Sequence, residues 1–118
     1  MKISIDFDGT IVKHDYPNIG EPVPHAIEQM EQFLKDGHEL ILWTMRSGKQ
    51  LNEAVEYLIK HGISLHGINE EPNQEEWTSS PKPYAHIYID DAAYGCPLVE
   101  VEGGKPYVDW SKITIKKV

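Results

Sequence analysis

Cysteine, positive charge and long apolar runs are all scarce in this sequence. Its one cysteine, Cys96, has no partner for an intramolecular disulfide, which favours a reducing, cytoplasmic setting. Lysine and arginine together number 11, against 19 aspartate and glutamate residues, for a formal charge of -8. This balance argues against general binding to nucleic acid or to an anionic membrane, because both require a basic surface. The charge balance does not exclude a small anionic ligand, because such a ligand needs only a local positive site.

The apolar stretches are too short for a membrane-spanning segment, which needs ~20 apolar residues. Asp6 and Asp8 interrupt the first of them early, so no signal peptide pattern fits. The composition, 40% hydrophobic and 25% charged over 118 residues, is typical of one globular domain. We therefore expect a single domain that spans residues 1–118.

Short apolar runs alternate with amphipathic segments along the chain. The spacing of apolar residues predicts one helix from near Pro24 to Gly37 and another from Ser47 to Gly62. The apolar runs predict strands at residues 2–7, 38–44, 63–68 and 86–90, with further strand candidates at 98–101 and 112–118. Strands that alternate with helices indicate right-handed crossovers and a parallel sheet. The expected fold class is therefore α/β, a single doubly wound domain whose central parallel sheet is flanked by helices.

Polar and charged side chains gather where the predicted strands end. In doubly wound sheets, ligands bind beyond the carboxyl ends of the strands. The residues at these ends are Asp6, Asp8, Gly9 and Thr10 after the first strand, Thr44 and Arg46 after the second, and Asp90 and Asp91 after the fourth. Lys82 stands just before the fourth strand, on a loop flanked by prolines.

These groups suit the chemistry of phosphate esters. Clustered carboxylates repel one another, and a hard divalent cation such as Mg²⁺, which prefers oxygen ligands, relieves that repulsion. Hydroxyl, ammonium and backbone N–H groups suit phosphate oxygens. One carboxylate can attack phosphorus to form an aspartyl-phosphate, while a second protonates the leaving oxygen and then activates water.

Each residue also has an ordinary explanation when it is taken alone. Asp-Gly is a frequent turn, Thr44 can be a satisfied core hydroxyl, and Asp90 with Asp91 can cap a helix. Lys82 can be a solvated surface lysine, and Arg46 is either a second phosphate cation or half of a surface ion pair. The combination favours a site, because its members stand at strand ends in one consistent order.

That order resembles the haloacid dehalogenase (HAD) superfamily of phosphohydrolases. The motifs are "DFDGT", an apolar strand that ends in Thr, a Lys, and an apolar strand that ends in Asp-Asp. Their matches spread over residues 3–91, so the resemblance covers most of the chain. The sequence is most similar to small capless (C0-type) bacterial members with "SPKPYA" before "YIDD". It departs from several of them at Ala92, where they carry arginine.

The resemblance implies how the carboxylates divide the work. Asp6 would be the nucleophile, and Asp8 would be the general acid/base and also offer its backbone carbonyl to Mg²⁺. Asp90 would bind the metal directly. Asp91 would either bind the metal as well or contact a group that binds it.

The resemblance also implies a phosphate site. Thr44 would hold a phosphoryl oxygen, and Lys82 would stabilise both the nucleophile and the transferring phosphoryl group. Backbone N–H groups near Gly9, Thr10 and Met45 would complete the cradle, and Arg46 is a candidate for a further cation.

The superfamily's members differ by cap domains, and the corresponding stretches of this chain are too short to fold as caps. The expected active site is therefore open. It accepts part of a large substrate, or a homodimer partner supplies a lid. Four glutamates in the loop at residues 69–83 would disfavour long polyanions such as DNA ends. We expect a small phosphorylated substrate, for example a sugar phosphate.

Two other functions fit parts of this pattern. A receiver-like signalling domain uses similar groups, but its phosphoacceptor follows the third strand, where this chain has "HGIN". A catalytically inert protein that binds phosphate or Mg²⁺ could keep such a site, although the intact motifs argue against it. His14, in the loop above the site, could contact the substrate, although a solvated loop position explains it more simply. Trp77 could also contact the substrate, although packing over the sheet edge explains it more simply.

Overall fold

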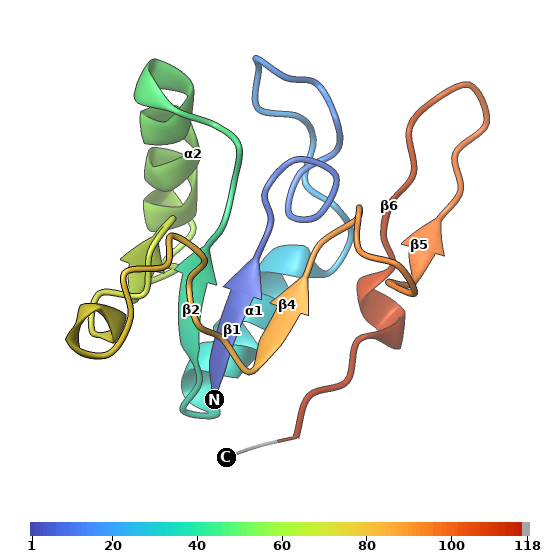
Figure 1. Ribbon diagram of the computed structural model, residues 1–118. Helices are drawn as coiled ribbons and strands as arrows, with labels where there is room; N and C mark the ends of the chain where they lie inside the picture. Colours follow the sequence, from blue (N-terminus) through green and yellow to red (C-terminus); the bar gives the residue numbers. More distant parts are fainter. Residues whose placement is uncertain (117–118) are drawn as a thin grey trace.

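Four short parallel strands form the centre of the domain in the computed structural model, which describes residues 1–116 (Figure 1). They are β1 (Lys2–Ile5), β2 (Glu39–Leu42), β3 (Gly67–Ile68) and β4 (Ile87–Ile89), in the order β3-β2-β1-β4. The chain adds β2 and then β3 on one side of β1, and β4 afterwards pairs with the other side of β1. This order confirms the predicted α/β sheet and creates a switch point between β1 and β4, where sheets of this kind bind ligands.

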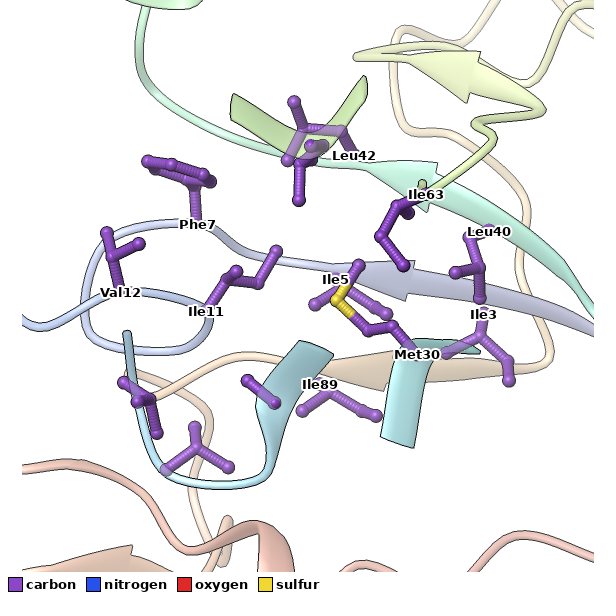
Figure 2. Close-up of a cluster of buried hydrophobic side chains, with 14 of the residues drawn as sticks. Ile3, Ile5, Phe7, Ile11, Val12, Met30, Leu40, Leu42, Ile63 and Ile89 are labelled. Carbon is purple, nitrogen blue, oxygen red and sulfur yellow. The ribbon is translucent and has the colours of Figure 1, made fainter. Parts of the chain in front are cut away.

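Two amphipathic helices, α1 (Ala26–Lys35) and α2 (Gly48–Lys60), bury their apolar stripes against one face of the sheet. Ile3 and Ile5 point toward this face, and Met30 of α1 lies against them in Figure 2. Both helices occupy their predicted ranges, and a glycine with positive φ follows each of them, as expected of a helix stop. Within residues 1–116, no helix has the length and apolar character that crossing a membrane requires.

The opposite face of the sheet is covered by an irregular segment in place of a helix. Ser4, Ile41 and Tyr88 share this face, because they are register partners on neighbouring strands. Residues 69–86, which include the 3-10 helix η1 (Gln74–Glu76), pass in front of the sheet in Figure 1, with α1 behind it. The buried Gln74 side chain holds this segment together by donating to the carbonyls of Ser80 (3.0 Å) and Lys82 (2.9 Å).

The C-terminal part of the chain forms a small antiparallel hairpin beside β4. Its strands are β5 (Leu98–Val99) and β6 (Tyr107–Val108), and the 3-10 helix η2 (Trp110–Lys112) follows. The strand predicted at residues 112–118 was wrong for residues 112–116, while residues 117–118 lie outside the described part. Trp110 is 1% exposed, and its indole N–H donates to the Thr10 carbonyl at 2.7 Å. This anchor turns the chain into the core just before the predicted strand would begin.

Candidate functional site

Three aspartates meet at the switch point of the sheet. Asp6 follows β1, and Asp90 and Asp91 follow the neighbouring strand β4. Each offers a carboxylate oxygen, and these oxygens all lie within 4.8 Å of one another. The sequence prediction that these residues come together is thus confirmed, because the carboxyl ends of adjacent parallel strands share one edge.

A tight turn after β1 ties this cluster together. The buried Thr10 hydroxyl donates to Asp6 Oδ2 at 3.1 Å and accepts the Asp91 N–H at 3.2 Å. The Gly9 N–H donates to the Val12 carbonyl at 2.7 Å, and the Thr10 N–H donates to the Phe7 carbonyl at 3.2 Å. These two N–H groups, which we expected to face a phosphate, are therefore bonded inside the turn.

Gly9 occupies a position where no side chain fits. Its φ is +82°, in the left-handed region, and an added Cβ would collide with Asp91 and with the His14 ring. The His14 Nε2 atom lies 2.8 Å from Asp91 Oδ2. The glycine thus allows the loop histidine to approach the acidic cluster.

Arg46, the only arginine of the sequence, is buried and fully engaged. Its Nε and Nη2 donate to the two oxygens of Asp8, both at 2.8 Å. The remaining N–H groups donate to the carbonyls of Asn18 (2.6 Å), Pro17 (3.3 Å) and Gln50 (3.4 Å). Since a guanidinium has five N–H donors, none is left for a phosphate in this arrangement. Arg46 is therefore half of an ion pair, as one of the two alternatives from the sequence had it, but the pair is buried and does not lie at the surface.

Asn69 is a residue of the site that sequence reasoning missed. It follows β3 with φ of 55°, and its Oδ1 accepts the Thr44 N–H at 2.8 Å. The Thr44 hydroxyl in turn accepts the Arg46 N–H at 3.1 Å. The rule that selected the other strand ends would also have selected Asn69, had amides been considered along with carboxylates.

A cavity of about 570 Å³ opens onto these groups. Its lining consists of Asp6, Asp8, His14, Tyr16, Thr44, Met45, Arg46, Asp90, Asp91 and Ala92. Most of the predicted site residues therefore share one cavity. Lys82 is not among them, because its ammonium lies 5.1 Å from the centroid of the Tyr88 ring, on the sheet face that the irregular segment covers.

Burial and mutual repulsion change the ionisation of the cluster. Burial, together with the negative charge of Asp90 and a hydrogen bond to Asp91, raises the pKa of Asp6 from 3.8 to about 8. Burial likewise raises the pKa of Asp90, although the Ala92 N–H opposes this shift. Such a cluster favours a bound cation, and its all-oxygen donor set matches hard ions such as Mg²⁺. Asp6, Asp90 and Asp91 could therefore hold a metal.

The Asp6 pKa predicts how stability depends on pH without metal. The folded state keeps a proton that the unfolded chain loses above pH 3.8, so this contribution to stability declines as pH rises toward 8. Its slope reaches at most about 1.4 kcal/mol per pH unit for one proton. Thermal melts in EDTA from pH 5 to 8 should show that the melting temperature of Asp6→Asn, relative to that of the wild type, increases as pH rises. A constant difference across this range would contradict the prediction.

A solved structure of a conserved protein coded by a locus from Bacteroides thetaiotaomicron is similar to this chain. The two sequences are 39% identical, and the match covers 94% of this chain and 84% of that chain, with a TM-score of 0.77. No protein-family model matches the sequence, and neither does any curated protein.

Proposed function

We propose that this chain, which belongs to the same family as the conserved Bacteroides thetaiotaomicron protein, is a Mg²⁺-dependent phosphohydrolase. Its substrates are phosphate monoesters of small metabolites, for example sugar phosphates. The observation that carries the proposal is the Asp6, Asp90 and Asp91 cluster at the switch point, facing a cavity of about 570 Å³. The order of the sequence motifs, which resembles the haloacid dehalogenase superfamily, supplies the reaction type.

Asp6 is the proposed nucleophile. One of its carboxylate oxygens attacks phosphorus, the ester P–O bond breaks, and an aspartyl-phosphate forms. Thr10 supports this role by holding Asp6 Oδ2 at 3.1 Å, which orients the carboxylate toward the cavity. Asp6 must act as an anion, and Mg²⁺ held by Asp6, Asp90 and Asp91 would favour the ionised form and neutralise charge on the phosphoryl group.

Asp8 is the proposed general acid/base. It gives a proton to the leaving oxygen and later takes one from the water that hydrolyses the aspartyl-phosphate, so that Asp6 is regenerated. Asp8 lines the cavity, and both of its oxygens accept bonds of 2.8 Å from Arg46, so the proton transfers require one oxygen to leave the guanidinium. Thr44 lines the same cavity as the proposed phosphate ligand, and Lys82 keeps its proposed role only if its side chain moves away from Tyr88.

The residue after β3 does not support the receiver-like alternative. Asn69 stands there with no carboxylate to accept a phosphoryl group, and its Oδ1 already accepts the Thr44 N–H. An enzyme therefore fits the distribution of carboxylates better than a phosphoacceptor domain does.

Removal of the metal is the direct test of the proposal. Purified protein should hydrolyse p-nitrophenyl phosphate with Mg²⁺ present, lose this activity in EDTA, and recover it when Mg²⁺ is added in excess. Asp90→Asn should require a higher Mg²⁺ concentration for half-maximal rate, whereas the matched control Asp36→Asn, beyond the end of α1, should not. Activity that survives EDTA would contradict the metal's role. A stable phosphoprotein after acetyl phosphate treatment, without turnover, would favour the receiver-like function.

A further inference from the structure

A second cavity of about 630 Å³ lies directly beside the acidic site. His14 and Tyr16 line both cavities, so the two spaces meet at these side chains. The rest of the second lining comes from the loop after β1 and from the β5–β6 hairpin: Lys13, Asp15, Val101, Gly104, Lys105 and Tyr107. The hairpin thus forms one wall of the second cavity.

This wall is fastened to the turn that carries the site. The Val108 N–H of β6 donates to the Gly9 carbonyl at 2.9 Å, and the Trp110 indole donates to the Thr10 carbonyl at 2.7 Å. In Figure 1, the loop after β1 and the hairpin both rise beyond the end of the sheet where β1 and β4 terminate. The second cavity therefore keeps a defined position relative to Asp6.

Two lysines give this cavity a cationic wall in a chain of formal charge -8. The Lys13 ammonium lies 5.3 Å from the centroid of the Tyr107 ring and 3.8 Å from a Glu21 oxygen. Lys105 forms no ion pair within residues 1–116. Asp15 also lines the cavity and Glu21 pairs with Lys13, so Lys105 is the lining cation that has no ion-pair partner within residues 1–116.

The tyrosines add flat, partly apolar surfaces to the same space. Tyr107 forms part of the hairpin wall, and Tyr16 stands between the two cavities. A volume of about 630 Å³ falls within the usual range for sites of small molecules, roughly 300–1,000 Å³. The space suits the carbon chain or ring of a metabolite with a charged end.

We propose that the second cavity binds the leaving group of the substrate and that this leaving group carries its own anionic group, a carboxylate or a second phosphate. The ester phosphate lies at the Asp6 cavity, the body of the molecule passes His14 and Tyr16, and the far anion meets Lys13 and Lys105. The inference rests on the proposed phosphohydrolase function for the position of the first phosphate. It narrows the substrate class from phosphate monoesters in general to esters with two anionic ends.

Two six-carbon esters provide the kinetic test, since 6-phosphogluconate and sorbitol 6-phosphate differ only in a terminal carboxylate. With Mg²⁺, the wild type should prefer 6-phosphogluconate, mainly through a lower KM. Lys105→Gln should reduce the ratio of the two kcat/KM values by about fivefold, the upper end of what a solvent-exposed ion pair contributes. Lys60→Gln, with the same charge change at the far end of α2, should leave that ratio unchanged. Equal kcat/KM for the two esters in the wild type would overturn the proposal.

Binding measurements separate this inference from the proposed function. Calorimetry on Asp6→Asn and on Asp6→Asn/Lys105→Gln should show that the second substitution weakens 6-phosphogluconate binding about fivefold more than sorbitol 6-phosphate binding. If the wild type hydrolyses no ester but this difference persists, the hydrolase function fails and the anion-binding cavity stands. If the wild type hydrolyses both esters and the difference is absent, the cavity proposal fails alone.

Discussion

Asp6→Asn should lose phosphatase turnover by at least about a thousandfold and keep the fold, because it removes the proposed nucleophile. The amide has nearly the same shape as the carboxylate, and its oxygen can still accept the Thr10 hydroxyl that now lies 3.1 Å from Asp6 Oδ2. The measurement is the rate of phosphate release from p-nitrophenyl phosphate with saturating Mg²⁺. Rapid acid quenching of wild-type turnover should also trap phosphate on the protein, and the variant should carry none.

The same substitution should not destabilise the metal-free protein. Burial and the neighbouring Asp90 raise the pKa of Asp6 to about 8, so the ionised carboxylate is unfavourable in the folded state. Near pH 8 the variant should therefore melt at or above the temperature of the wild type. Asp36→Asn serves as the matched control and should keep full activity. Wild-type turnover in Asp6→Asn would remove this residue from the nucleophile role.

Arg46→Met should lower the free energy of unfolding by about 3–5 kcal/mol, the usual cost of removing one partner of a buried ion pair. Its side chain is 1% exposed, and that of Asp8 is only 18% exposed, so both charges are largely removed from water in the folded state. The carbonyls of Pro17, Asn18 and Gln50 would lose their donor as well. For a domain of this size, the expected drop in melting temperature is roughly 10–20 °C.

A double-mutant cycle can show that the pair with Asp8 causes this loss. Arg46→Met/Asp8→Asn should be less destabilised than the sum of its single variants, because the second change removes the stranded charge. Arg46→Lys should fall between Arg46→Met and the wild type, since lysine keeps the charge but cannot form the two parallel bonds. Lys49→Met, at an exposed position of α2, controls for loss of a positive charge. A loss below about 1 kcal/mol in Arg46→Met would place Arg46 among ordinary surface residues.

Sequence patterns located the helices better than the later strands. Both helices occupy their predicted ranges, because the spacing of apolar residues and the terminal glycines are local signals. The strand predicted at residues 112–118 was wrong over residues 112–116, although its alternating pattern looked equally regular. Trp110 overrides that pattern by bonding to Thr10, a hundred positions earlier in the chain. No local rule anticipates such a contact.

Sequence patterns alone predicted that Asp6, Asp90 and Asp91 stand at the carboxyl ends of parallel strands, whereas the adjacency of β1 and β4 came from the fold. Parallel strands present their carboxyl ends at one edge, so residues that directly follow two adjacent strands must lie close together. The contacts of Arg46 and Lys82 and the position of the hairpin depend instead on how the whole chain folds. A long cationic side chain reaches whichever acceptors the fold brings near it, and here they are Asp8 and loop carbonyls for Arg46 and an aromatic ring for Lys82. The second cavity likewise exists only because the hairpin packs beside the turn after β1.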